Sequence, residues 1–133
     1  VAVIGGGLTG CEIAYDLYLK GKPPTIIEMQ DDLITTKGIC LANTSYLRDF
    51  FKTNKVPVFL ETSLSQIKSG GVELIDKTGN QFALPADSVI MSVGYTPAPI
   101  AAKGKHIHVI GDAAKVGNLR TVIWGAWDVC MKL

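Results

Sequence analysis

The stretch VAVIGGGLTGCEIA, residues Val1 to Ala14, decides the fold of this chain. It begins with four apolar residues, and a short apolar run that ends at glycine is typical of a buried parallel strand. Three glycines and then Gly10 follow, after which apolar residues recur at helical spacing. Strand, glycine turn and helix in this order predict the first half of a βαβ unit.

The glycines of this stretch fit the spacing G-x-G-x-x-G at Gly5, Gly7 and Gly10. Gly5 permits a tight turn, Gly7 lets the backbone approach a pyrophosphate, and Gly10 lets the helix pack closely on the strand. The helix start, with Leu8 and Thr9, offers free N–H groups and a partial positive charge to phosphates. We therefore expect these five residues to bind a dinucleotide.

Glu28 selects the nucleotide in this interpretation. The segment Thr25–Met29 (TIIEM) predicts the second strand of the unit, and Glu28 lies near its end. A carboxylate there accepts hydrogen bonds from both ribose hydroxyls and repels a 2′-phosphate, and no arginine follows it. We expect NADH rather than NADPH. An S-adenosylmethionine-dependent methyltransferase has a similar glycine turn and acidic residue, and it stays open as an alternative at this point.

The rest of the chain predicts an α/β fold. A helix is expected over Ala42–Thr53 and a third strand over Val56–Leu60. Short alternating segments separated by glycine then predict an antiparallel meander: Leu64–Lys68, Val72–Asp76 and Gln81–Leu84. Further strands are expected at Ser88–Val93 and Ile107–Ile110, and a last helix at Leu119–Met131. The expected architecture is a Rossmann-type three-layer sandwich with a mainly parallel sheet, helices on its faces and the β-meander as crossover.

Composition excludes several classes of partner. The 133 residues carry a net charge of +1, which gives no electrostatic reason to expect nucleic acid or an anionic membrane. No apolar run approaches 18 residues and no signal peptide is visible, so we expect a cytoplasmic protein without membrane contact. Three widely spaced cysteines form no C-x-x-C, and His106 and His108 have no ligand cluster beside them. We expect no metal site and reduced thiols.

Three motifs together resemble the glutathione-reductase-like flavoproteins. GGGLTGCEIA (Gly5–Ala14) is similar to the glycine turn of their NADH-binding domain, and PADSVIMSVGYTPA (Pro85–Ala98) to the segment that closes it. HIHVIGDAAKVGNLRTVIWGA (His106–Ala126) is similar to their final flavin motif. NLRTVIWGAWDV (Asn118–Val129) narrows the resemblance to the C-terminal part of 2-enoate reductases and 2,4-dienoyl-CoA reductases, which are NADH:flavin oxidoreductases with an old-yellow-enzyme-like barrel.

The resemblance divides the chain into two segments. Residues 1–93 would be the NAD(H)-binding Rossmann domain, and residues 94–133 a strand–helix segment that completes the FAD domain of a longer parent. It implies that Glu12 in the first segment and Gly94 at the start of the second lie near the NADH; a charge favoured by the helix dipole and a plain turn glycine are the alternatives. In the second segment it implies FAD contacts from four residues: Gly111, Asp112, Asn118 and Leu119.

The implied function is transfer of a hydride from NADH to FAD within that parent, with FMN and a 4Fe-4S cluster elsewhere in it. No residue is expected to act as a catalytic acid or base, because the cofactors carry the chemistry. The chain starts inside a strand, so we expect an excised piece of a longer protein. The resemblance implies a second glycine-rich βαβ unit for the FAD adenosine, and this chain has only one, so we expect it not to retain FAD and to be inactive alone. The alternative is a stand-alone dinucleotide-binding or interaction domain without turnover.

The expected partner is the rest of the parent flavoenzyme. Trp124 and Trp127 lie three residues apart on the last expected helix. They either pack in a core or form an exposed apolar patch that meets the flavin domain and would favour self-association of this piece.

Overall fold

The computed structural model describes all 133 residues, which form two compact units, Val1–Gly94 and Tyr95–Leu133. Assignment of NADH to the first segment and FAD to the second stays a prediction. The elements of the first unit are β1 (Ala2–Ile4), α1 (Leu8–Leu19), β2 (Thr25–Ile27), α2 (Leu41–Thr53), β3 (Val58–Phe59), β4 (Thr62–Lys68), β5 (Gly71–Asp76), β6 (Gln81–Pro85) and β7 (Val89–Met91). The second unit contains the 3₁₀ turn η1 (Gly111–Ala113) and α3 (Leu119–Cys130).

A four-stranded parallel sheet forms the middle of the first unit. Its strand order is β3-β2-β1-β7, and β1 pairs in parallel with β2 on one side and with β7 on the other. The predicted strands are confirmed, although all four are shorter than expected. The neighbour of β1 on one side, β2, comes before the meander in the chain, and its neighbour on the other side, β7, comes after it. The strand order therefore changes direction at β1. Ligands bind at such points in open α/β sheets.

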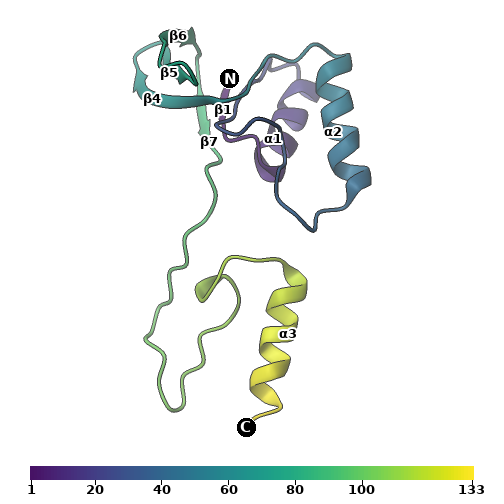
Figure 1. The fold of residues 1–133 in the computed structure, drawn as a ribbon, viewed down its shortest axis with the longest axis vertical. Helices are drawn as coiled ribbons and strands as arrows, with labels where there is room; N and C mark the ends of the chain where they lie inside the picture. Colours follow the sequence, from purple (N-terminus) through teal and green to yellow (C-terminus); the bar gives the residue numbers. More distant parts are fainter. The chain divides into compact units, whose positions relative to one another are not determined.

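The parallel sheet is buried on both faces, which confirms the three-layer α/β architecture. Val3 and Ile26 pack with the inner residues of α1 and α2 on one face. Ala2, Ile4 and Ile27 pack on the other face with Val72, Leu74 and further residues of the antiparallel sheet. Neighbouring strand residues point to opposite faces, so each short strand contributes to both cores. Both helices cover the same face, and the meander takes the second face that was expected to carry helices (Figure 1).

The two helices of the first unit contact each other through aromatic rings. The Tyr15 ring on α1 lies 4.7 Å from the Phe50 ring on α2, and the Tyr18 ring lies 5.2 Å from it, both edge to face. On α2, Thr44, Leu47 and Phe51 are buried at spacings of three and four residues, as a helix with one inner face requires.

The predicted antiparallel meander is confirmed as a second sheet of order β4-β5-β6. The β4–β5 pairing is irregular between Leu64 and Gln66, where the register shifts. Val72 and Leu74 alternate with more exposed residues along β5, so one face of this sheet is apolar. That apolar face is the one that packs on the parallel sheet.

The second unit consists of loops, one 3₁₀ turn and one helix. The strand predicted at Ile107–Ile110 is wrong: this segment contributes only an isolated antiparallel bridge between Gly104 and Ile107. A strand needs a neighbouring strand, and this unit contains none. The predicted last helix is confirmed as α3, and none of its residues is buried. No helix of the chain is both long and apolar enough to cross a membrane.

Truncation of Leu74 tests the packing between the two sheets. Leu74→Ala removes a fully buried side chain and should lower the free energy of unfolding by about 2–5 kcal/mol, measured by urea denaturation. Ile67→Ala in the same sheet is the matched control, because Ile67 is 51% exposed, and it should change stability by about 0.5 kcal/mol or less. Equal losses from the two variants would contradict the assigned packing.

Candidate dinucleotide site

The turn between β1 and α1 leaves no room for side chains at two of its glycines. Gly5 has a φ of +106°, and a Cβ there would overlap the carbonyl oxygen of Ser92 at the end of β7. A Cβ on Gly10 would overlap the carbonyl oxygen of Gly5. Close approach of backbone to backbone therefore requires glycine at both positions, and Ser92 is a participant that the sequence did not identify.

Gly7 differs from these two glycines because nothing lies near it. It is the N-cap of α1 with a φ of −67°, and a Cβ there would have no neighbour within 4 Å. No side chain caps the helix. The amides of the first turn, which includes Leu8 and Thr9, have no acceptor within the helix. A helix start with open space in front of it is a seat for an anion such as a pyrophosphate.

Glu28 lies directly after β2 and is only 8% exposed. Its Oε2 accepts a hydrogen bond from the amide of Gly6 at 2.5 Å, and its Oε1 accepts one from the amide of Gln30 at 2.8 Å. Each carboxylate oxygen has a second lone pair, so both can still accept a hydrogen bond from a ribose hydroxyl. The carboxylate is thus fixed in orientation before any ligand arrives.

A side chain at position 6 would collide with Leu33 and Glu28. A Cβ on Gly6 would come within 2.5 Å of a Leu33 methyl group and within 3.0 Å of the Glu28 Cβ. The middle glycine of the triplet therefore lets the Glu28 side chain lie against the turn. The G-x-G-x-x-G spacing gives no signal for this role, because Gly6 falls on a variable position of the pattern.

Glu12 and Gly94 were implied by resemblance alone. Glu12 is exposed on α1, but it lies beyond the first helical turn, which contains no acidic residue. The alternative of a first-turn charge is therefore wrong for Glu12. Gly94 follows β7, the parallel neighbour of β1, and its φ of +93° favours glycine. Contact of either residue with NADH stays a prediction.

A groove begins at the residues that follow Glu28, and its lining is acidic. It is lined by Met29, Gln30, Asp31, Glu61, Ser63, Ile75, Asp76 and Lys77. Its one cation, Lys77, already pairs with Glu61 at 2.6 Å, and this pairing raises the pKa of the lysine. A hydrogen bond from the Thr78 hydroxyl lowers the pKa of Asp76, which keeps this carboxyl ionised. A further negative group would be repelled here.

The four residues proposed for FAD lie in the second unit. Gly111 has a φ of +61°, and the neighbouring Asp112 is exposed while its Oδ1 accepts a hydrogen bond from the Gly117 amide at 3.0 Å. Asn118 caps α3, and its own amide donates to the Thr121 hydroxyl at 3.0 Å. The Asn118 amide is therefore engaged, whereas Leu119 begins the helix and is exposed. FAD binding by these residues stays a prediction.

Cys11 lies beneath the glycine turn and is fully buried. Its Sγ donates a hydrogen bond to the carbonyl oxygen of Gly6 at 3.3 Å. Burial, with a smaller contribution from the nearby Glu28 charge, raises the pKa of the thiol from 9.0 to about 12. A thiol that keeps its proton is a packing group and a poor nucleophile.

Comparison with known proteins places the chain among flavin-linked oxidoreductases. The family described as pyridine nucleotide-disulphide oxidoreductase matches residues 1–112. A cinnamate reductase of Clostridium sporogenes is 34% identical over all of this chain, which covers 21% of that protein. An NADH oxidase of Thermoanaerobacter brockii is 30% identical over all of this chain, again covering 21% of the relative. The chain thus spans about a fifth of the length of these curated relatives.

Solved structures share the fold at lower identity. A 2-naphthoyl-CoA reductase complex has a TM-score of 0.81 at 22% identity, over 99% of this chain and 21% of that one. Histamine dehydrogenase from Rhizobium sp. 4-9 has a TM-score of 0.77 at 16% identity, over 99% of this chain and 23% of that one. The thioredoxin reductase of T. acidophilum has a TM-score of 0.62 at 24% identity, over 72% of this chain and 31% of that one. These similarities concern the fold alone.

Alanine at Gly10 should destabilise the fold more than alanine at Gly7. Gly→Ala inside a helix ordinarily stabilises by about 0.5–1 kcal/mol, but at Gly10 the new Cβ meets the Gly5 carbonyl. Gly10→Ala should therefore lower the free energy of unfolding by about 1–3 kcal/mol. Gly7→Ala enters open space at the N-cap and should cost less than about 1 kcal/mol in urea denaturation. A stabilised Gly10→Ala protein would contradict the close approach.

Thiol labelling should separate the three cysteines. Cys40 and Cys130 are exposed and should react with a dithiobis-nitrobenzoate reagent at pH 8, whereas Cys11 should react only after denaturant is added.

The raised pKa of Cys11 also has a consequence for the stability of the fold. The folded protein keeps this proton between pH 9.0 and about 12 while the unfolded chain loses it, so the free energy of unfolding should fall as pH rises through that range. Cys11→Ala should lack that part of the pH dependence.

Proposed function

Because the chain belongs to the pyridine nucleotide-disulphide oxidoreductase family, we propose that it binds NADH and holds it for hydride transfer to FAD. The observation that carries the proposal is the glycine turn: an open helix start at Gly7 lies beside a carboxylate, Glu28, that is already fixed in place. The two features fit the pyrophosphate and the ribose of a dinucleotide. The methyltransferase alternative is wrong, since the family match extends over residues 1–112.

The choice of NADH over NADPH rests on charge. Glu28 can accept hydrogen bonds from the ribose hydroxyls, and the groove beyond it contains Asp31, Glu61 and Asp76. The one lysine in the groove is paired with Glu61. A 2′-phosphate on this ribose would meet several carboxylates and no available cation, which supports the specificity expected from Glu28.

The contribution of this chain to the reaction is binding and orientation. Bound NADH supplies the hydride and FAD accepts it, so the chemistry belongs to the cofactors. Gly7 allows the backbone to approach the phosphates, and Gly5 and Gly10 keep α1 aimed at them. Glu28 orients the adenosine end, and Glu12 and Gly94 are proposed to lie along the nicotinamide end. No proton transfer is assigned to Cys11, because its raised pKa keeps the thiol protonated.

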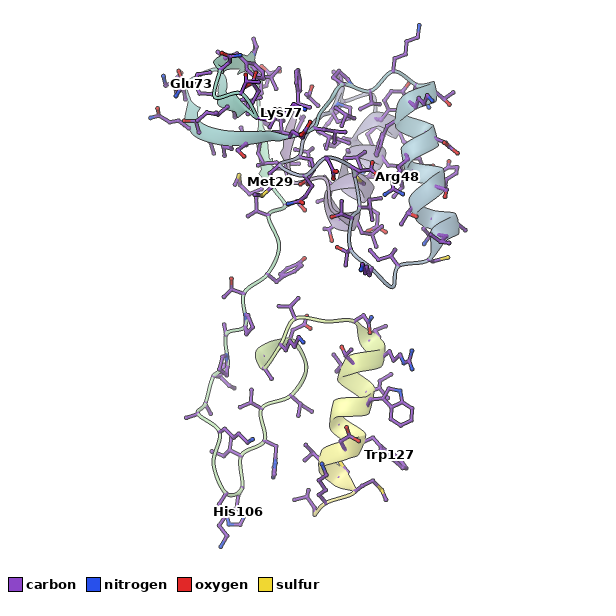
Figure 2. The ribbon with its side chains drawn as sticks, viewed as in Figure 1. Met29, Arg48, Glu73, Lys77, His106 and Trp127 are labelled. Carbon is purple, nitrogen blue, oxygen red and sulfur yellow. The ribbon has the colours of Figure 1, made fainter.

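We further propose that the second unit completes an FAD site in a longer enzyme. Asp112 offers a second carboxylate oxygen to the flavin ribityl chain, and the Leu119 amide at the start of α3 is free to face the flavin ring. On α3, Ile123, Trp124 and Trp127 are each more than half exposed (Trp127 is labelled in Figure 2). An apolar helix face of this kind suits packing against the rest of such a protein, or against a second copy of this piece.

The parent is proposed to be a flavin-dependent reductase of the 2-enoate or enoyl-CoA type, with FMN and a 4Fe-4S cluster outside this chain. Support comes from a relative named for cinnamate reduction and a structural neighbour named for 2-naphthoyl-CoA reduction. Another relative is named as an NADH oxidase and another as a bilirubin reductase, so the electron acceptor varies among similar proteins.

Calorimetric titration with NADH and NADPH, with and without added FAD, tests the proposal. NADH should bind more tightly than NADPH. Glu28→Gln, which keeps one carbonyl oxygen to accept a backbone hydrogen bond, should weaken NADH binding about 10- to 150-fold, the cost of about 1.5–3 kcal/mol for a charged hydrogen bond.

Glu73→Gln is the matched control, because Glu73 lies on β5 and pairs with Lys68 on the antiparallel sheet (Figure 2). This variant should bind NADH as the wild type does. Tighter binding of NADPH than of NADH, or an unchanged affinity in Glu28→Gln, would rule out the assigned role of Glu28.

A further inference from the structure

Arg48 on α2 holds the loop that follows β2. Its Nη2 donates hydrogen bonds to the carbonyl oxygens of Leu33 and Ile34, the second at 3.4 Å. The same nitrogen lies 3.1 Å from the Asp32 carboxylate. Arg48 is labelled in Figure 2. One guanidinium nitrogen thus lies against three consecutive residues; since Nη2 has only two N–H groups, they are shared among the three acceptors, and the contact with Ile34 is the longest.

The loop held by Arg48 is joined to the glycine turn. The amide of Ile34 donates a hydrogen bond to the carbonyl oxygen of Gly6 at 2.8 Å. The amide on the other side of Gly6 donates to Glu28. A Leu33 methyl group occupies the place where a Cβ of Gly6 would be. Contacts therefore run without a break from Arg48 through Ile34 and Gly6 to the carboxylate of Glu28.

Ile34 needs this support because of its backbone. Its φ is +52°, a left-handed conformation that is a genuine outlier for a β-branched residue. Such a conformation persists only where the surroundings determine it strongly, and such residues cluster at binding sites. Ile34 is 4% exposed, so its side chain is held by the core while its carbonyl is held by Arg48. The Nε of Arg48 is buried and has no hydrogen-bond partner. The side chain thus makes its Nη2 contacts with the loop while its Nε–H group stays unsatisfied.

We propose that Arg48 is a positioning residue for the dinucleotide: it fastens Asp32–Ile34 onto Gly6 and thereby fixes the Glu28 carboxylate for the ribose. The inference rests on the proposed NADH function. Arg48 does not touch the ligand in this arrangement and acts through Ile34 and Gly6. The loop could not otherwise keep the left-handed Ile34, and without the loop the Gly6 carbonyl oxygen would lose the hydrogen bond that it accepts from the Ile34 amide.

Two variants of the protein test the proposal. Arg48→Met removes every donor and should weaken NADH binding about tenfold in calorimetric titration, in line with the loss of charge-assisted hydrogen bonds. Arg48→Lys keeps the charge and one contact and should recover affinity to within about threefold of the wild type. Lys52→Met is the matched control, because it removes a positive charge one turn further along the same helix at an exposed position.

Hydrogen exchange of the ligand-free protein provides a second measurement. Arg48→Met should speed exchange of the Ile34 and Gly6 amides about tenfold or more and leave that of Val3 in β1 unchanged. A role in general stability would instead speed exchange at Val3 as well.

The outcomes separate this inference from the proposed function. A wild-type protein that fails to bind NADH overturns both. A wild type that binds NADH, with equal affinity in Arg48→Met and unchanged exchange at Gly6, overturns only the role of Arg48. If Arg48→Met does not fold, Arg48→Gln, which keeps an N–H donor but neither the charge nor the guanidinium group, decides the question: NADH affinity and Gly6 exchange identical to the wild type would also overturn the role.

Discussion

The carbonyl oxygen of Gly5 lies against the backbone of Gly10, and the arrangement of the first unit depends on this contact. It lets α1 start at the very end of β1, so that the helix returns along the parallel sheet and covers one face of it. On its other side Gly5 meets Ser92, which brings the end of β7 to the same place. Because Gly5 and Gly10 have no side chains, the start of α1 can lie close to the ends of both β1 and β7.

The parallel sheet survives with very short strands because it is covered on both sides. β1 has three residues, and all three are buried. Val3 contributes to the core beneath the helices, while Ala2 and Ile4 contribute to the core beneath the antiparallel sheet. So short a ladder provides few hydrogen bonds, and the burial of apolar side chains on two faces supplies the larger part of the stabilisation. The meander is therefore part of the scaffold of the site rather than a simple connection.

The sequence allowed prediction of those features that arise from neighbouring residues. The glycine turn, the βαβ unit and the meander have local patterns, and Glu28 follows from its spacing to Gly5. The link between Gly6 and Glu28 was not predictable, because it depends on a packing contact with Leu33. A single Arg48 within a helix gave no signal either, since its partners are carbonyl groups of a distant loop. The strand expected at Ile107–Ile110 failed for the complementary reason: its residues suit a strand, but no partner strand lies beside it.

The two hydrogen bonds that Glu28 makes to backbone amides have a consequence for coenzyme engineering. In the proposed NADH site, Glu28 is the residue whose charge would have to be reversed to admit a 2′-phosphate. Here, replacement of that residue by a cation would leave the amides of Gly6 and Gln30 without acceptors in a nearly buried position. A successful switch therefore has to start by supplying a new acceptor for the turn, and only then can the charge of the pocket be reversed.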